Sequence, residues 1–401
     1  MIELGLRGWP VAPATIRTPE ANAAMSGLLV SPSQTGHVET DDDVVVEATP
    51  EFDFLSVEYR ALFDRAAATA FQSPVWLDGL YGRLVPAAAA RPLIVTLRER
   101  RSRRLVVVLP LVVRRHLGLR VARFADLGVS DYCAAVVDPA FAPFVSTRAV
   151  TARVRAALHG VDLVLVSKVP DAALATFGLL GDILASAMPV HAHFLDPGGS
   201  RAAWRTRTHG KCRGSTLDGK RRKLARQGRL ETRMLSDGER ITAAIEAVGA
   251  FRRERFQARR IVDLLAQPAY AAFYREIGGK TPPARAYVMS LGDRTIAAGF
   301  GIVVGGAFHL LLSGFDTGFR NESVGLLLIE DIVLDCLRRG ERGIDLTIGD
   351  QPYKAQFGSA ASDLWAVCLG IGHIGRIAAA LLAREGWARR TAQFLAHRRP
   401  L

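Results

Sequence analysis

Apolar residues become regularly spaced only after about residue 50. Residues 1–50 are rich in Pro, Ser, Thr and Ala and show no sustained apolar period, so we predict a disordered leader there. From residue 52 onwards the spacing is helical, and it is carried by Leu55, Tyr59, Leu62 and Phe63. Pro74 suits the first turn of a second helix. Apolar runs of strand length then occur at 93–98, 105–114 and 132–137, followed by a helix at 146–158 and a strand at 161–166.

The same order of elements returns in the second half of the chain. A helix near Gln72 leads into a strand at 92–97, and a helix near Gln267 leads into a strand at 286–291. Gly160 and Asp162 are matched by Gly343 and Asp345. The repeat of about 190 residues is too long for a solenoid. It indicates two copies of one α/β domain with a boundary near 197–200.

Composition agrees with a two-domain globular protein. The chain has 401 residues, of which 49% are hydrophobic and 23% are charged. Its net charge of +13, almost all from arginine, favours acidic partners such as a CoA phosphate, a polysaccharide or an anionic membrane. The same surplus is also expected of any arginine-rich proteome.

Cysteine and apolar patterns indicate a cytoplasmic protein without a metal. The four cysteines form no CxxC pair and read as reduced, buried thiols. We find no secretory signal at the start and no run of eighteen apolar residues. The nearest run, 366–383, is interrupted by His373 and Arg376 and is predicted to be one helix.

The first candidate site is an anion site at a helix start. The order is a strand over 307–316, a polar loop over 317–322, an apolar helix over 323–338 and a strand over 343–348. We predict Ser323 as the helix N-cap, with Gly325 leaving backbone N–H groups uncovered. Such a helix start attracts anions, and Arg320 adds a charge that can grip a phosphate.

The second candidate site follows the strand at 343–348. Strand ends beside a helix start are where α/β sheets open to ligands. Asp345 or Asp350 could deprotonate an attacking hydroxyl or amine, and Tyr353 or Lys354 could polarise a carbonyl or protonate a leaving group. The alternative is structural: an ion pair between Asp345 and Lys354, with Tyr353 in the core.

The third candidate is the basic stretch 201–229. Leu217 and Leu224 lie seven residues apart and predict a helix with one apolar seam. The cationic side chains could form a solvated face or bind an acidic acceptor, RNA or lipid headgroups. Trp204 is the aromatic residue nearby for base stacking, so nucleic acid is not an expected partner.

Taken together, these motifs resemble a known family. The Gln-Ser-Pro-x-Trp-Leu start at residue 72, the Ser130-Asp131-Tyr132 step, the basic stretch and the run from Gly349 to Lys354 are similar to GNAT-type acetyltransferases of cellulose and exopolysaccharide biosynthesis (CelD/BcsL type). The resemblance covers about residues 52–370. It implies tandem duplicated GNAT-like (acyl-CoA N-acyltransferase) domains of α/β or α+β class, with mixed central sheets flanked by helices, related to the FemABX double-GNAT proteins.

The family also implies roles for particular residues. Its pyrophosphate-binding pattern falls on Arg320, Ser323, Val324 and Gly325, with Ser323 in place of the first glycine. Residues 140–148 show no such pattern, so the resemblance assigns acyl-CoA to the C-terminal half and the acceptor to the N-terminal half. The family's Tyr-Lys pair falls on Tyr353 and Lys354. We expect the acceptor to meet Arg222, Lys223 and Arg226.

Four segments are therefore predicted: the leader over 1–50, a degenerate acceptor-side half over 51–197, an acyl-CoA-binding half over 198–370 and a basic helical tail over 371–401. The predicted activity transfers an acetyl or longer acyl group from acyl-CoA to a hydroxyl or amine of a saccharide or envelope precursor. The protein would be cytoplasmic, with peripheral contact to an anionic inner membrane. Two alternatives stay open: a FemABX-like transferase that uses aminoacyl-tRNA, and a non-catalytic scaffold of an exopolysaccharide synthesis complex.

Overall fold

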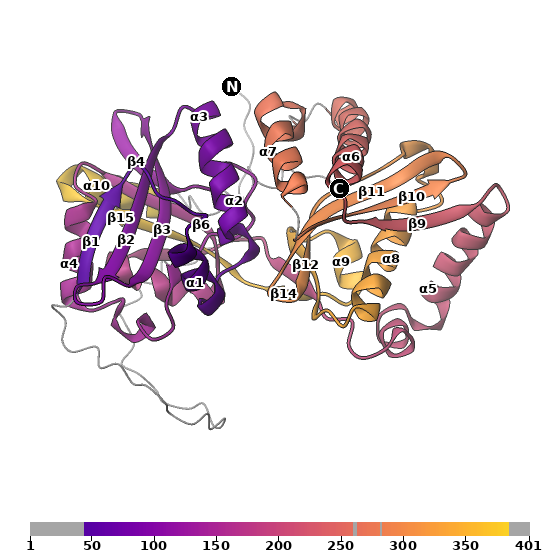
Figure 1. Cartoon of the computed structure of the whole chain (residues 1–401), viewed down its shortest axis with the longest axis horizontal. Coiled ribbons are helices and arrows are strands. Elements are labelled where there is room, and N and C mark those ends of the chain that lie inside the picture. The colour runs from indigo at the N-terminus through magenta and orange to yellow at the C-terminus, as the bar shows by residue number, and fades with distance from the viewer. Residues whose placement is uncertain (1–43, 260–262, 281–282, 385–401) are drawn as a thin grey trace.

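The chain forms two α/β halves that lie next to each other (Figure 1). The computed structural model describes residues 44–259, 263–280 and 283–384. Most of the predicted leader and residues 385–401 of the predicted tail lie outside these ranges. Residues 44–49 lie inside them and form strand β1 (Val44–Thr49), so the leader prediction is wrong at its C-terminal end. The reason is pairing, because β1 forms the edge of the sheet and pairs antiparallel with β2 over its whole length.

Each half is built on one mixed sheet. The N-terminal sheet has the order β1, β2 (Arg91–Glu99), β3 (Leu105–His116), β4 (Leu119–Phe124), β6 (Leu163–Pro170), β15 (Leu364–Gly370) and β7 (Leu184–Ala187), with β5 (Val136–Val137) on β3. The C-terminal sheet has the order β9 (Leu230–Leu235), β10 (Ala284–Leu291), β11 (Arg294–Val304), β12 (Ala307–Phe315), β13 (Gly343–Ile348), β8 (Ala192–Leu195) and β14 (Ala360–Ser362).

The two sheets share one topology. In each, four antiparallel strands lead to one parallel pair, β4 with β6 and β12 with β13, and two antiparallel strands follow. A helix connects the strands of each parallel pair: α4 (Arg148–Ala157) in the N-terminal half and α8 (Val324–Arg338) in the C-terminal half. The predicted internal duplication is confirmed at the level of topology.

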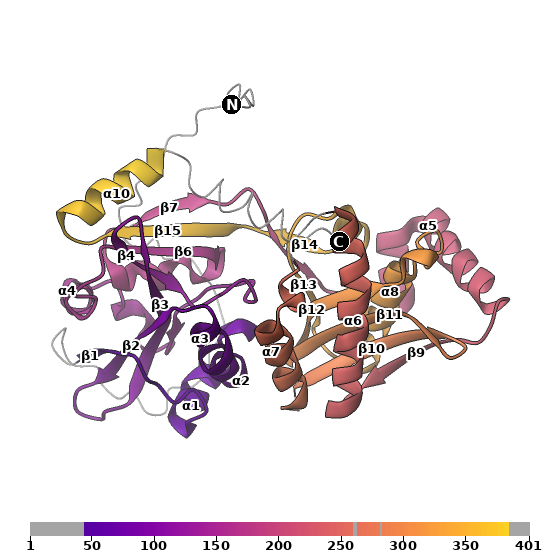
Figure 2. The ribbon, with the colours of Figure 1, turned by 90° about the horizontal axis from the view of Figure 1, so that it is seen from above.

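Each half contributes one strand to the interior of the other half's sheet. β8, which precedes the predicted boundary at 197/198, lies in the C-terminal sheet, and β15, which precedes the predicted boundary at 370/371, lies in the N-terminal sheet. The predicted boundaries therefore do not separate the two sheets. The crossing of the chain between the halves is visible in Figure 2.

Helices cover the faces of both sheets. In the N-terminal half they are α1 (Val57–Arg65), α2 (Pro74–Gly79), a π-type segment (Leu80–Leu84), α3 (Val85–Ala87) and α4. In the C-terminal half they are α5 (Arg201–Ala225), α6 (Gly238–Arg259), α7 (Pro268–Gly279), α8 and α9 (Pro352–Gln356). Short 3-10 segments are Ala70–Gln72, Ala142–Phe144, Asp171–Leu180, Leu264–Ala266 and Thr317–Phe319.

The predicted helix over 366–383 is wrong in its first part. Residues 364–370 form the buried strand β15, and only Gly372–Arg384 form a helix, α10. A short continuous apolar run fits a buried strand as well as a buried helix. Gly372, at φ 67°, turns the chain between the two elements in a conformation that glycine adopts without strain.

One hydrophobic core spans both halves. Trp76 on α2 and Phe273 on α7 meet edge to face with ring centroids 5.0 Å apart. Gly79 lets the two helices approach, since a Cβ there would lie 3.3 Å from Ile277 Cδ1. The Trp76 indole also donates to Ser130 Oγ at 2.9 Å. Shared packing of this kind holds the two halves in one arrangement.

Candidate active site

The parallel strands β12 and β13 separate after a short paired stretch. They pair only over Ala307–His309 and Gly343–Asp345. β12 carries an extra residue, Leu311, in its pairing with β11, and β13 carries an extra residue in its pairing with β8. Such bulges bend and twist a strand. The N-terminal ends of the two strands are therefore paired, whereas their C-terminal ends diverge and leave a gap in the sheet.

The equivalent gap in the N-terminal half is filled by the chain itself. β4 and β6 also pair over only three residues. The buried segment from Ser130 to Ala135 lies beside β6, and the Cys133 amide donates to Lys168 O at 2.9 Å. This physical difference favours the C-terminal half as the site of ligand entry.

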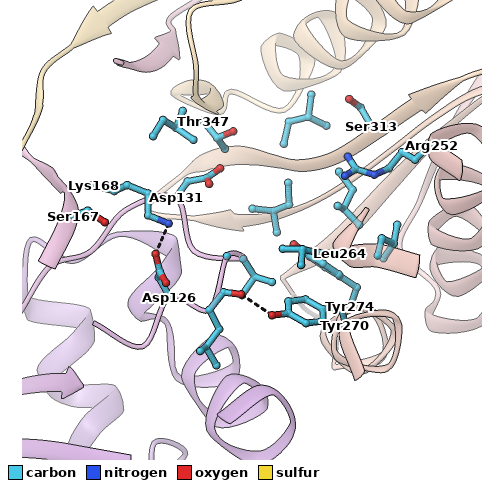
Figure 3. Close-up of a pocket in the computed structure, with 18 of the residues that line it drawn as sticks. Asp126, Asp131, Ser167, Lys168, Arg252, Leu264, Tyr270, Tyr274, Ser313 and Thr347 are labelled. Atoms are coloured by element: carbon cyan, nitrogen blue, oxygen red, sulfur yellow. Dashed lines mark hydrogen bonds and ion pairs between the residues drawn. The ribbon is translucent and has the colours of Figure 1, made fainter. Parts of the chain in front are cut away.

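A cavity of about 480 Å³ lies at the gap and between the two halves. Its C-terminal wall comes from β12, β13, α6, α7 and α9, and its N-terminal wall comes from the segment after β4 and from β6 (Figure 3). The volume falls in the range of small-molecule sites. Tyr270 on α7 ties the two walls together by donating to Leu127 O at 2.9 Å.

The N-terminal wall carries a lysine and two aspartates. Lys168 is buried, and its ammonium lies 2.6 Å from Asp126 Oδ2 and also donates to Ser130 O. Burial alone would lower the pKa of Lys168, but the negative charge of Asp126 outweighs it and holds that pKa above its usual range. Asp131 is buried beside them, and Asp126 is partly exposed to the cavity.

The C-terminal wall contains two of the four predicted catalytic residues, Tyr353 and Lys354. Lys354 is buried, and its ammonium donates to Thr347 O at 3.0 Å and to Ile348 O at 3.1 Å. It therefore braces the end of β13, where Thr347 has a φ of 61°. Tyr353 precedes it on α9 and is partly buried.

Asp345 does not line the cavity. It is buried, and its Oδ1 accepts from the Tyr132 hydroxyl at 2.7 Å and from the Thr347 amide at 2.7 Å. Its Oδ2 lies 3.2 Å from His309 Nδ1. Both carboxylate oxygens are engaged by donors, which is the geometry of a positioning residue that joins the two halves.

Asp350 also lies outside the cavity lining. Its Oδ1 accepts from His193 at 2.9 Å and from His191 at 3.0 Å. Partial burial would raise the pKa of Asp350, but the hydrogen bonds from His193 and His191 outweigh it and lower that pKa.

The predicted phosphate site at the start of α8 is separate from the cavity lining. Ser323 occupies the N-cap position with φ 53° and ψ 43°, but its side chain makes no capping bond and instead accepts from Lys220. Val324 is buried and Arg320 is exposed. A Cβ at Gly325 would lie 3.0 Å from Phe315 Cδ1, so this position requires a small residue.

The three predicted acceptor residues lie at the C-terminal end of α5, and one of them contacts the segment before α8. Arg222, Lys223 and Arg226 are exposed at the end of α5, and Lys223 Nζ lies 2.7 Å from Glu322 Oε1. None of them lines the cavity. Lys223 thus lies beside the residues predicted to bind the donor.

Part of the basic stretch is neutralised within the fold. Arg205 pairs with Asp218 at 2.9 Å and with Glu330, and Arg221 pairs with Asp331 at 2.6 Å. The predicted apolar seam is confirmed, because Leu217 and Leu224 are buried. Trp204 is buried as well and cannot stack on a base from solvent.

Sequence reasoning missed the polar cluster of the N-terminal wall. Asp126 follows β4 and Lys168 lies within β6, and no local motif joins them. Asp131 appears in the Ser130-Asp131-Tyr132 step, which is the one signal that pointed to this segment.

The described residues contain neither a metal-binding cluster nor a membrane-spanning helix. Within 44–259, 263–280 and 283–384, no cluster of three or more His, Cys, Asp or Glu could hold a metal ion. Across the same ranges, no helix combines the length and apolarity needed to cross a bilayer.

Comparisons with known proteins agree with this architecture. Residues 210–355 match the family model of the acetyltransferase (GNAT) domain. The crystal structure of FemX is similar at 10% identity and a TM-score of 0.53, covering 80% of this chain and 96% of that one. A protein of unknown function from Bacteroides thetaiotaomicron is similar at 9% identity and a TM-score of 0.51, covering 81% and 100%. No curated protein matches the chain.

At such identities the structural likeness shows the fold alone, whereas the family match extends to sequence. The match begins in α5 and ends just after Tyr353 and Lys354, so it includes the gap between β12 and β13. The sequence match to the acetyltransferase (GNAT) domain is confined to residues 210–355, and the chain as a whole has a duplicated GNAT-like fold.

Proposed function

We propose that the protein transfers an acetyl or longer acyl group from acyl-CoA to a hydroxyl or amine of a saccharide or cell-envelope precursor. The observation that carries the proposal is the gap between β12 and β13, which opens into a cavity shared by both halves. A GNAT domain supports the acyl-CoA donor, and a second wall from the N-terminal half supports a separate acceptor side.

The donor would span from the start of α8 to the cavity. The first amides of a helix have no intrahelical acceptor, and the positive end of the helix dipole adds to their attraction for a diphosphate. Arg320, Ser323, Val324 and Gly325 would hold the pyrophosphate there. Lys220 and Lys223 contact Ser323 and Glu322, respectively, and add positive charge at this helix start. We therefore propose that the three predicted acceptor residues, Arg222, Lys223 and Arg226, serve the donor side instead.

The acyl group would react in the cavity. The acceptor oxygen or nitrogen attacks the thioester carbonyl, the new C–O or C–N bond forms, and the C–S bond breaks. We place the departing acceptor proton on Asp126, because its carboxylate faces the cavity while Asp345 and Asp350 do not. Tyr353 would return a proton to the CoA thiolate, and Lys354 would hold the end of β13 in place.

The acceptor class and location follow from the resemblance rather than from the cavity. We propose a precursor of cellulose or another exopolysaccharide, acetylated at nitrogen or oxygen, and a cytoplasmic protein peripheral to the inner membrane. A tRNA-linked donor is the weaker alternative, because Trp204 is buried and Arg205 and Arg221 are paired within the fold.

Calorimetry with acetyl-CoA and longer acyl-CoAs tests the donor site. Ser313→Trp on β12 would fill the gap and is expected to weaken binding at least tenfold. Ser290→Trp on β10 makes the same chemical change outside the cavity and is expected to bind as the unmodified protein does. An unmodified protein that binds none of these thioesters would refute the proposal.

Release of CoA thiol with saccharide acceptors tests the chemistry. Asp126→Asn is expected to lower kcat by about 10²-fold or more, in keeping with the contribution of a general base, and to leave acetyl-CoA affinity unchanged. Equal kcat for Asp126→Asn and the unmodified protein would exclude Asp126 as the proton acceptor.

A further inference from the structure

Helix α10 lies on the outer surface of the N-terminal half, away from the C-terminal half (Figure 2). It packs on β15 and β6 through small residues. Gly375 and Ala379 are buried, and a Cβ built on Gly375 would lie only 1.8 Å from Asp162 O. Since any side chain at this position would collide with the backbone, the face of α10 that contacts the sheet is fixed.

The opposite face of α10 is apolar. Ile374, Ile377 and Leu381 are 67%, 63% and 55% exposed, respectively. Their spacing of three and four residues places them on one stripe of the helix. A helix on the surface of a globular protein normally turns such a stripe inward, so α10 has the reverse of the usual pattern.

The charges around this stripe match an anionic surface. Arg376 and His373 are exposed on α10. The sequence from residue 384 to the end contains one acidic residue, Glu385, against Arg384, Arg389, Arg390, Arg398 and Arg399. An exposed apolar stripe together with a cationic segment is the combination by which helices lie in the interface of an anionic bilayer.

We propose that Ile374, Ile377 and Leu381 dock α10 on the surface of an anionic lipid bilayer, with Arg376 contacting the headgroups. Helix α10 would be the surface through which the protein makes the peripheral membrane contact proposed above, and this proposal does not depend on acyl transfer. Docking through α10 would hold the N-terminal half on the bilayer.

Flotation of the full chain with vesicles tests the proposal. Vesicles of phosphatidylcholine with phosphatidylglycerol are expected to bind the protein, and vesicles of phosphatidylcholine alone are expected to bind it at least tenfold less. The triple variant Ile374→Ser, Ile377→Ser, Leu381→Ser is expected to lose at least tenfold in binding to the anionic vesicles. The matched control is Val57→Ser, Leu117→Ser, which removes two other exposed apolar side chains, 85% and 90% exposed, and should bind unchanged.

Three outcomes would overturn the proposal. The first is no binding of the unmodified chain to anionic vesicles, and the second is equal binding of the triple variant. The third is that light scattering shows a dimer for the unmodified chain and a monomer for the triple variant, while the unmodified chain does not bind vesicles. The stripe would then be an interface between two copies of the chain. Thermal unfolding of the triple variant should match that of the unmodified protein, and CoA-thiol release without vesicles reports the proposed activity separately.

Discussion

At the scale of single residues, Asp345 links the two halves at the point where the sheet opens. It sits at the last paired position of β13, accepts from Tyr132 of the N-terminal half, and bonds the Thr347 amide within the bulge. A buried carboxylate is stabilised only when donors surround it. The loss of one donor to Asp345 therefore lowers the free energy of unfolding more than the loss of a hydrogen bond between neutral groups does.

We expect Tyr132→Phe to lower the free energy of unfolding by about 2 kcal/mol, because it leaves a buried carboxylate oxygen short of a donor. Tyr59→Phe is the control: its buried hydroxyl donates to the uncharged Gln72 O at 2.7 Å, and its loss should cost about 1 kcal/mol. Urea unfolding measures both. Equal losses for the two variants would contradict the role given to Asp345.

The same residues show how far sequence can lead to a site. Tyr353 and Lys354 could be predicted, because a strand end followed by polar residues in an α/β sheet is a local signal. Tyr132 and Asp345 are 213 positions apart, and their contact depends on the packing of one half against the other. Asp126 and Lys168 were missed for the same reason, since only the fold brings them together.

At the scale of elements, the two halves place the same irregularity in equivalent strands. β6 has an extra residue opposite β15, and β13 has one opposite β8. Lys168 and Thr347 occupy these bulges with φ values of 62° and 61°. The order of strands and helices could be read from apolar periodicity, but bulges leave no such periodic trace. For this reason sequence predicted the duplication and missed the gap's geometry.

Helix α8 is anchored at its C-terminal end by Asp335. Its carboxylate accepts from Tyr287 on β10 at 2.8 Å and from Arg339 at 2.8 Å. Burial would raise the pKa of Asp335, but the hydrogen bonds from Arg339 and Tyr287 outweigh it and lower that pKa. The ionised form is therefore favoured in the folded state, and the stabilisation is present above the ordinary aspartate pKa of about 4.

We expect Asp335→Asn to be less stable than the unmodified protein at pH 7, and the difference to shrink as the pH falls below about 4, where the carboxyl becomes protonated in both states. Urea unfolding between neutral and acidic pH measures this difference. Asp182→Asn, at an exposed position, should change stability by less than about 0.5 kcal/mol throughout. A deficit of Asp335→Asn that stays constant with pH would rule out the titration of this group as its cause.

At the scale of the whole molecule, strand exchange makes each sheet depend on the other half of the chain. β15 is the central partner of β6 and β7, and it reaches the N-terminal sheet only after the C-terminal half is complete. Domain boundaries predicted from the order of elements along the chain miss such an exchange, because the local sequence of β15 does not specify which sheet it joins. The shared core around Trp76 and Phe273 adds to this dependence.

Two truncated chains test whether the N-terminal sheet needs β15, or whether the two halves are joined only by surface packing. A chain that ends at Asp363 keeps β14 but loses β15, so β6 keeps only its short pairing with β4 and β7 loses the strand with which it pairs. The buried side chains of Val164 and Val166 on β6 then become more exposed. We expect its N-terminal half to lose protection from hydrogen exchange, although all residues from 44 to 187 remain. A chain that ends at Ile371 keeps β15 and loses α10 and residues 385–401, and it should retain that protection. If both chains protect β2, β3 and β6 equally, β15 is not needed to hold the N-terminal sheet together, and the halves are joined by surface packing alone.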